Sequence, residues 1–238
     1  MQFKNFTVSY GKKEILKALT FELSPRSLTV LVGKNGSGKS TLLRAVNREV
    51  PYRGELLLEG KPLASLSLRE QAKRIAFLPQ LLPTPALTVE GLAALGRSPY
   101  LGLSGRLAES DRKKIEAALR LSGAEAWRDR PLSTLSGGER QRAYLAMILA
   151  QDADIWLLDE PTTYLDPGAV SDFLALLRTL AREQDKAILA VLHDLNAAVA
   201  YADRLLLLHE GRLADPAALE QVFGVQKYTA EDGSVFYR

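Results

Sequence analysis

The stretch Leu28-Thr29-Val30-Leu31-Val32-Gly33-Lys34-Asn35-Gly36-Ser37-Gly38-Lys39-Ser40 joins a short apolar run to a glycine-rich turn. Residues 33–40 fit the pattern G-x-x-x-x-G-K-[ST], which binds phosphate when a strand precedes it and a helix follows it. We expect residues 28–32 to form that strand and residues 40–47 to form that helix. The stretch therefore predicts a phosphate-binding loop in an α/β fold. A glycine-rich turn without a ligand is the alternative.

Each residue type in this loop has a chemical reason to be there. Glycines allow backbone N–H groups to turn toward phosphate oxygens, and the N-terminus of the following helix adds partial positive charge. Lys39 is predicted to neutralise β- and γ-phosphate oxygens, and Ser40 to offer its hydroxyl to a magnesium ion. The predicted nucleotide-binding residues of the loop are Gly33, Asn35, Gly36, Ser37, Gly38, Lys39, Ser40 and Thr41.

A phosphate-binding loop of this kind needs an acidic partner on a neighbouring strand, and residues 155–160, Ile-Trp-Leu-Leu-Asp-Glu, provide one. The four apolar residues predict a buried strand. Two carboxylates follow at its carboxyl end, where ligands bind in open α/β sheets. Asp159 is predicted to hold the magnesium shell, and Glu160 to polarise the attacking water as the catalytic base. A surface acidic turn is the alternative, but the matching loop favours an enzyme that hydrolyses a nucleotide.

Further short apolar runs predict more strands of the same sheet. They cover residues 75–78, 155–158, 188–192 and 205–208. Continuous apolar runs of this length are typical of parallel strands that are buried on both faces. Residues 167–182 carry a helical pattern, and Pro167 suits the first turn of a helix. The alternation of strands with helices predicts an α/β fold with a central parallel sheet.

Two regions depart from this alternation. Apolar side chains between residues 3 and 21 alternate on either side of Gly11 and Lys12, which predicts an antiparallel ribbon. Residues 87–149 have helical character instead. Helices are expected there at residues 89–95, 110–121 and 138–150, with a break at 99–105.

These regions suggest how the chain is organised. We expect one domain over residues 1–238, in which residues 1–86 and 151–238 form the ribbon and the core. Residues 87–150 are expected to form a helical subdomain inserted between strands. A hairpin is expected around Asp232 and Gly233, near the end of the chain, and no chemistry is assigned to it.

The overall composition excludes several classes of protein. The 238 residues are 47% hydrophobic and 25% charged, which is ordinary for a globular chain. A net charge of +3, spread along the chain, gives no indication of nucleic-acid binding. Without cysteine there is no disulfide and no thiolate metal site. The first ten residues lack the pattern of a signal peptide. No apolar run reaches the roughly 20 residues that a membrane-spanning helix needs, so any role at a membrane is expected to act through a partner.

A third motif narrows the class. Residues 135–141, Leu-Ser-Gly-Gly-Glu-Arg-Gln, resemble the signature sequence of the ABC (ATP-binding cassette) ATPase family, and the resemblance extends over about residues 3–213. It implies a RecA-like P-loop NTPase core with an antiparallel β subdomain and an inserted helical subdomain. It also implies a head-to-tail homodimer, in which Ser136, Gly137 and Gly138 contact the ATP held by the other copy's P-loop. Lys34 is a departure, because many relatives carry proline there, but this variable loop position tolerates it.

Four more positions match motifs of that family. The resemblance implies that Tyr10 stacks on adenine and that Gln80 contacts magnesium and senses the permease. It implies that Asp166 lies in a loop that communicates between the paired sites, and that His193 contacts the γ-phosphate. Each of three residues also has a purely structural alternative. Tyr10 could be an aromatic residue packed in the ribbon, Gln80 a polar residue of a loop, and His193 a histidine that only supports the fold. His209 is assigned no role.

A finer resemblance concerns the kind of transporter. Segments at 67–70, 77–80, 88–89, 95–100 and 161–166 resemble the ATPases of iron–siderophore, haem and cobalamin importers. This implies ATP and Mg²⁺ as cofactors, a separate membrane permease as partner, and an indirect link to a substrate-binding protein. It also implies a place on the cytoplasmic face of the plasma (inner) membrane. The surface between Gln80 and Tyr100 is expected to receive a cytoplasmic helix of the permease. Charges at Leu82 or Leu87, in its apolar segment 81–87, are expected to spare basal ATP hydrolysis and to lower transport.

Other functions use the same catalytic motifs. An importer of free zinc or manganese ions and an exporter or lipid-linked ATPase are the alternatives. A soluble ABC ATPase that acts on DNA needs a long coiled-coil insertion, and one that acts on the ribosome needs a second cassette; this sequence has neither. A non-catalytic role is disfavoured because the set of catalytic side chains is intact.

Overall fold

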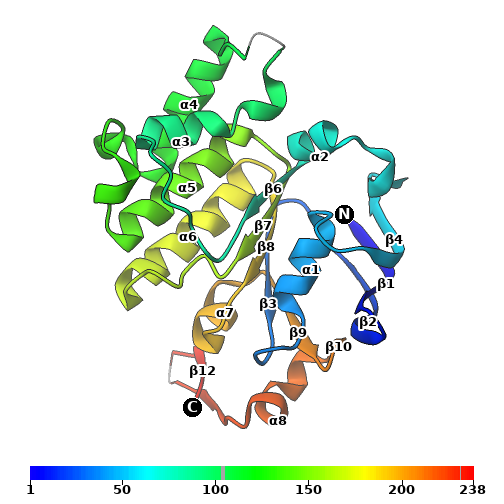
Figure 1. Cartoon of the computed structure of the whole chain (residues 1–238). Coiled ribbons are helices and arrows are strands. Elements are labelled where there is room, and N and C mark those ends of the chain that lie inside the picture. The colour runs from blue at the N-terminus through cyan, green and yellow to red at the C-terminus, as the bar shows by residue number, and fades with distance from the viewer. Residues whose placement is uncertain (103–104, 231) are drawn as a thin grey trace.

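A sheet of six described strands forms the centre of the molecule (Figure 1). The computed structural model describes residues 1–102, 105–230 and 232–238. The sheet has the order β10-β9-β3-β8-β7-β6. Its members are β3 (Ser27–Val32), β6 (Ile75–Leu78), β7 (Ile155–Asp159), β8 (Ala187–Val191), β9 (Arg204–His209) and β10 (Arg212–Ala214). All neighbours are parallel except β10, which pairs antiparallel with β9. The five predicted strands therefore lie in one sheet, which confirms the α/β fold.

A smaller antiparallel sheet lies beside the first (Figure 1) and has the order β2-β1-β4-β5. β1 (Gln2–Tyr10) and β2 (Lys13–Glu22) form the predicted ribbon, and β4 (Tyr52–Leu58) and β5 (Lys61–Pro62) extend it. Phe3 stacks on Phe21 across the ribbon, with ring centroids 4.1 Å apart. The buried face of this sheet shares a hydrophobic cluster with α1 (Lys39–Val46), so the ribbon is fixed next to the P-loop.

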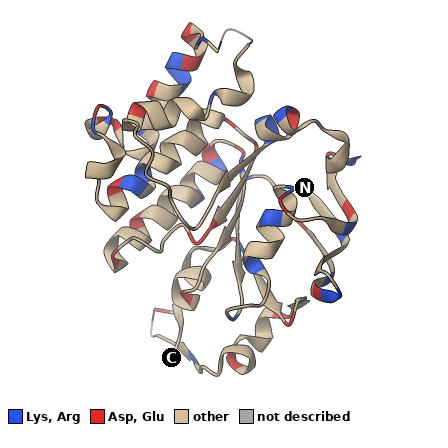
Figure 2. Cartoon of the chain, in the orientation of Figure 1, with Lys and Arg blue, Asp and Glu red and all other residues tan. Residues whose placement is uncertain are grey.

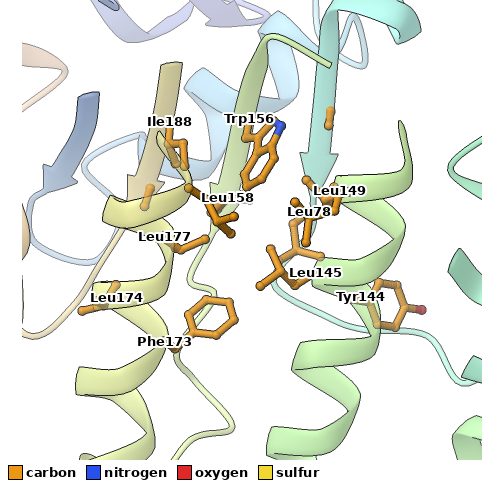
Figure 3. Packing of buried hydrophobic residues seen from close by; sticks show 14 of the residues in the cluster. Leu78, Tyr144, Leu145, Leu149, Trp156, Leu158, Phe173, Leu174, Leu177 and Ile188 are labelled. Carbon is orange, nitrogen blue, oxygen red and sulfur yellow. The ribbon is translucent and has the colours of Figure 1, made fainter. Parts of the chain in front are cut away.

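Helices cover the central sheet and extend beyond it. α3 (Val89–Leu95), α4 (Glu109–Ser122) and α5 (Gly137–Gln151) pack on one another, as expected for the helical region (Figure 1). The other helices are α2 (Leu68–Arg74), α6 (Pro167–Glu183), α7 (Leu195–Tyr201) and α8 (Leu219–Phe223). Figure 3 shows Leu145 of α5 and Phe173 of α6 directed toward the strand that carries Trp156. These three side chains are fully buried, so both helices pack on the face of the sheet that Trp156 occupies and share one core with it.

Some expected elements have different ends, and some elements are not expected from the sequence. The helix after the P-loop begins at Lys39, one residue before the predicted start. The predicted break at 99–105 includes residues 103 and 104, which lie outside the described residues. Three of the described α-helices are not among the predicted ones: α2, α7 and α8. For α2 the sequence contains a signal, because Ser67 and Glu70 form a capping box. The expected hairpin consists of β11 (Lys227–Thr229) and β12 (Val235–Tyr237).

Charged side chains of both signs are mixed along the outer elements, as α4 illustrates in Figure 2. When positive and negative side chains are mixed in this way, their long-range electrostatic fields largely cancel, and neither sign of charge dominates on these elements. Of the helices that the structure describes, none combines the length and the apolar character needed to cross a bilayer.

Candidate nucleotide-binding site

The P-loop connects the end of β3 to α1, and two of its glycines are required by the local geometry. A Cβ atom on Gly33 would lie 2.3 Å from the carbonyl oxygen of Leu208 in the neighbouring strand. Gly38 has a φ of 109°, and a Cβ atom there would lie 2.6 Å from Cδ2 of Leu16. A side chain at either position would push the loop away from the sheet or from the ribbon. The glycines therefore determine where the loop backbone runs.

Lys39 is buried at the start of α1. Its Nζ donates hydrogen bonds to the carbonyl oxygens of Gly33 at 2.7 Å and Lys34 at 3.2 Å. Burial lowers the pKa of this ammonium group, and the carboxylates of Glu160 and Asp159 oppose that shift. A cation that has lost part of its hydration is stabilised by an anion placed beside it. The group is therefore suited to interact with phosphate.

Ser37 offers a further polar group in the same loop. Its Oγ is buried and has no hydrogen-bond partner among the described residues. A buried hydroxyl without a partner is uncommon, because it loses its bonds to water. A phosphate oxygen bound in the loop would satisfy it, so this observation fits an anion site.

Ser40 and Asp159 meet across the gap between α1 and the end of β7. Ser40 Oγ donates to Asp159 Oδ1 at 3.2 Å. Burial is the main cause that raises the pKa of Asp159; the nearby Glu160 adds to the rise, while the bond from Ser40 and the charge of Lys39 oppose it. The described chain contains no group of three or more His, Cys, Asp or Glu side chains that would bind a metal by themselves. The pair therefore offers two oxygen donors to a hard cation rather than a closed cage.

Glu160 is held by side chains from the two strands that flank β7. Gln80, just after β6, donates from Nε2 to Glu160 Oε2 at 2.6 Å. His193, just after β8, contacts Glu160 Oε1 through Nε2. Thr163 Oγ1 donates to the backbone carbonyl of Glu160 at 3.1 Å. Glu160 also has a φ of 51°, which non-glycine residues rarely adopt, and strain of this kind is common at functional sites.

These groups surround one cavity of about 460 Å³. It is lined by Ile15, Asn35, Gly36, Gly38, Lys39, Ser40, Thr41, Gln80, Glu160 and His193. Nine of these ten residues are predicted site residues. Ile15 is not, and it has no sequence signal beyond its place in an alternating ribbon. The predicted residues outside the lining are Tyr10, Gly33, Ser37, Ser136, Gly137, Gly138, Asp159 and Asp166.

Tyr10 and the signature residues are separate from this cavity. Tyr10 is 47% exposed and pairs with Lys13 at the end of the ribbon. Ser136 is the N-cap of α5 and forms a capping box with Glu139. The carboxylate of Glu139 accepts a bond from Ser136 N at 2.7 Å, which is the main reason why the pKa of Glu139 is lowered. None of the described cavity residues comes from the signature, so within one copy the signature lies outside the P-loop cavity.

The signature packs against the segment that precedes α6. A Cβ atom on Gly137 would lie 2.9 Å from both Cβ and O of Tyr164, so only glycine allows this contact. Asp166 caps α6 by accepting a bond from Ala169 N at 3.0 Å. The two motifs, separated by almost thirty positions in the sequence, therefore form one surface of the chain.

A glycine-rich loop between β3 and α1, together with carboxylates at the end of β7, defines a P-loop nucleotide hydrolase. The sequence model of the ABC transporter family matches residues 16–163. The chain belongs to this family, and it is an ATP-binding subunit that couples ATP hydrolysis to transport.

Two similar proteins align with nearly the whole chain. The ferric enterobactin transport ATP-binding protein FepC of Escherichia coli is 39% identical over 240 residues, which are 96% of this chain and 89% of that protein. The hemin import ATP-binding protein HmuV of Pseudomonas putida is 38% identical over 243 residues, which are 94% of this chain and 92% of that protein.

Two solved structures have the same fold. One is an inward-facing ABC transporter described as metal-chelate type, with a TM-score of 0.83 and 25% identity over 100% of this chain and 95% of that chain. The other is the dimeric structure of a bacterial ABC transporter cassette, with a TM-score of 0.78 and 26% identity over 90% of this chain and 96% of that chain.

Proposed function

We propose that this chain hydrolyses ATP to drive the import of a metal chelate, such as an iron–siderophore complex or haem, through a separate permease. The observation that carries the proposal is the arrangement around Glu160, which is held between Gln80 and His193 at the P-loop cavity. The cargo class rests on the similar ferric enterobactin and hemin import proteins. In this proposal the chain works on the cytoplasmic face of the plasma (inner) membrane, where the permease holds it.

The charged and polar residues of the P-loop region have separate roles in the proposed reaction. Glu160 accepts the proton of the attacking water as general base. His193 contacts the γ-phosphate and, through its bond to Glu160, links the base to the nucleotide. Lys39 neutralises the β- and γ-phosphates, and the P-loop backbone with Ser37 and Thr41 surrounds them. These residues act by position and charge, which is how phosphoryl transfer is generally catalysed.

Tyr10 is proposed to stack on the adenine ring. The ribbon that carries it also carries Ile15, which lines the cavity, and this supports the proposal that the adenine ring lies beside the ribbon end. An exposed aromatic ring at such an edge offers a flat apolar face at small entropic cost.

Ser40, Asp159 and Gln80 are proposed to hold a magnesium ion. They offer oxygen donors, which Mg²⁺ prefers, and Mg²⁺ is usually bound by one or two protein groups together with phosphates. When bound, the ion supplies positive charge to the phosphate oxygens. Asp159 has the buried position at the end of β7 that orients its carboxylate toward Ser40.

The substitution Asp159→Asn is expected to affect Mg²⁺ binding and the stability of the unliganded fold differently. Without ligand, we expect Asp159→Asn to melt at the same temperature as the wild type or higher, because burial disfavours the ionised carboxylate. The extra rise in Tm that Mg²⁺ gives in the presence of ATP should be lost. Differential scanning fluorimetry measures both effects, and Asp154→Asn, at the exposed start of the same strand region, is the control. A lower unliganded Tm with a normal Mg²⁺ response would contradict the assignment.

A second copy of the chain is proposed to complete the site. Ser136, Gly137 and Gly138 form a helix N-terminus outside the cavity, and such a terminus binds anions. In a head-to-tail homodimer they contact the nucleotide held by the other copy, and Asp166 lies in the adjoining segment. The dimeric form of a similar cassette supports this arrangement.

A surface near Gln80 is proposed to receive the permease. Leu81, the residue after Gln80, is 74% exposed, so its apolar side chain is available to a partner. The segment after Gln80 is tied to the signature helix, because Tyr144 Oη donates to Pro83 O at 2.6 Å. Docking on this segment is therefore linked mechanically to both Glu160 and the signature.

The segment 81–87 does not face outward along its whole length. Leu82 and Leu87 are partly buried and pack against the main core, so a charge there is expected to damage the fold. The expectation that these two residues are the docking contacts is therefore replaced by Leu81, the exposed member of the segment. The sequence alone does not indicate which apolar side chain of an irregular segment turns inward.

Leu81→Asp is expected to leave basal ATP hydrolysis unchanged and to lower transport about tenfold, which corresponds to a loss of roughly 1.4 kcal/mol of docking energy. Uptake into vesicles that contain the permease and this chain measures the effect. Leu121→Asp on α4 is a matched control, because Leu121 is 43% exposed. Equal transport by the two variants would show that Leu81 is not a docking contact.

The cargo class is tested with the substrate-binding protein that this proposal implies. We expect tight binding of a ferric siderophore, haem or cobalamin in a titration that also includes zinc, manganese, a sugar and a peptide. Tight binding of free metal ions alone would favour the metal-ion importer. Tight binding of only a sugar, peptide or amino acid would overturn the cargo assignment and leave the ATPase mechanism intact.

A further inference from the structure

The C-terminal hairpin lies against the helix that follows His193. β11 pairs antiparallel with β12, and backbone bonds between Gln226 and Arg238 continue the pairing at its open end. β12 is next to α7 (Figure 1), and Tyr237 is half-buried against the main core. A two-stranded hairpin has little stability of its own, so its position depends on this contact.

Asn196 of α7 makes the polar part of the contact. Its Oδ1 accepts a hydrogen bond from Tyr237 N at 2.7 Å, and its Nδ2 donates to Tyr237 O at 3.2 Å. The side-chain amide thus presents one donor and one acceptor to the edge of β12, as a neighbouring strand would. Two bonds to one residue fix the orientation of the hairpin as well as its distance from α7.

The same residue lies in the first turn of α7. Asp194 is the N-cap, and its Oδ1 accepts bonds from Asn196 N at 2.8 Å and Ala197 N at 3.1 Å. α7 has seven residues, and a helix this short depends on tertiary contacts for its position. His193 immediately precedes the cap and contacts Glu160. A movement at the start of α7 is therefore passed directly to the imidazole.

We infer that Asn196 is a positioning residue for ATP hydrolysis, through which the C-terminal hairpin holds α7 and the His193 side chain in place. The inference rests on the proposed role of His193 at the γ-phosphate. Nucleotide binding depends mainly on the P-loop, which lies on β3 and α1 and is separate from the hairpin. Loss of the contact should therefore lower kcat and leave KM for ATP nearly unchanged.

Full-length variants test this inference. Asn196→Asp is the most informative, because an acidic side chain stabilises the first turn of a helix but cannot donate to Tyr237 O. Tyr237→Pro removes the N–H group that bonds to Asn196 and leaves Asn196 itself unchanged. We expect kcat to fall about tenfold in each single variant, within the range of about 10²-fold that a misplaced reacting group produces. The double variant Asn196→Asp, Tyr237→Pro should be no slower than the slower of the two single variants, because both changes break the same contact.

A control variant and measurements of Tm distinguish a specific loss of kcat from general destabilisation. Lys227→Ala changes an exposed hairpin side chain and retains the backbone bond from Lys227 to Glu220, so its kcat should equal that of the wild type. Wild-type kcat in Asn196→Asp, or effects that multiply in the double variant, would overturn the inference. A rise in KM that parallels a lower Tm would overturn it too, because this is the result of general destabilisation.

His193→Ala distinguishes failure of this inference from failure of the proposed function. If His193→Ala retains full turnover, the proposed role of His193 is wrong, and the inference falls with it. If His193→Ala is inactive while Asn196→Asp and Tyr237→Pro are normal, only the positioning role is wrong.

Discussion

Glu160→Gln is expected to bind ATP normally and to hydrolyse it about 10²–10⁴-fold more slowly than the wild type. The amide has nearly the same shape as the carboxylate but cannot accept the proton of the attacking water. The amide at position 160 keeps one oxygen, which can accept a hydrogen bond from Gln80 or His193. The positions of these two side chains should therefore change little. Phosphate release measures turnover, and fluorescence of a labelled nucleotide measures binding.

A matched control exists at another strand end. Glu210 follows β9, has a φ of 48° and is exposed, so Glu210→Gln makes the same chemical change in the same backbone conformation outside the cavity. It should hydrolyse ATP at the wild-type rate. Undiminished hydrolysis by Glu160→Gln would exclude Glu160 as the base, and a loss of ATP binding would show that the residue acts before the chemical step.

Ser136→Arg is expected to reduce hydrolysis to the level of Glu160→Gln while each single chain still binds ATP. The P-loop cavity contains no described residue of the signature, so binding within one copy should survive. A long cation at the exposed N-terminus of α5 should prevent the second copy from approaching, by bulk and by removal of the cap. Equilibrium binding and turnover, measured on the same sample, separate the two effects.

Ser67→Arg is the control for the loss of the helix N-cap that Ser136→Arg causes. Ser67 is also an N-cap in a capping box with a glutamate, so this change removes an equivalent interaction from α2, worth about 1 kcal/mol. Both variants should lose similar thermal stability, and only Ser136→Arg should lose turnover. If Ser136→Arg hydrolyses ATP as fast as Ser67→Arg, the signature has no part in the active site.

The sequence predicts the P-loop and the carboxylate pair because each is a local motif. The spacing of Gly33 and Lys39, and the apolar run before Asp159, are visible without knowledge of the fold. The five parallel strands are predicted for a similar reason, since a strand that is buried on both faces is apolar along its length. In these places local propensity and tertiary packing demand the same residues.

Relations between distant segments are not predicted in the same way. Gln80, Glu160 and His193 are each identified as site residues, but the bonds that join them depend on the order β8-β7-β6 in the sheet. Ile15 lines the cavity because the ribbon packs beside the P-loop. No sequence motif predicts this packing. The hairpin is predicted from Asp232 and Gly233, but its bond to α7 requires tertiary structure.

The most direct test of the account is the molar mass of Glu160→Gln in solution, measured by light scattering with and without ATP. In the proposed dimer, two copies enclose two ATP molecules, each between the P-loop of one copy and the signature of the other. We therefore expect a monomer without ATP, a dimer with ATP and one bound nucleotide per chain. The same variant with Ser136→Arg added should remain a monomer. A monomer of Glu160→Gln at high protein and ATP concentration, with ATP bound, would contradict the account.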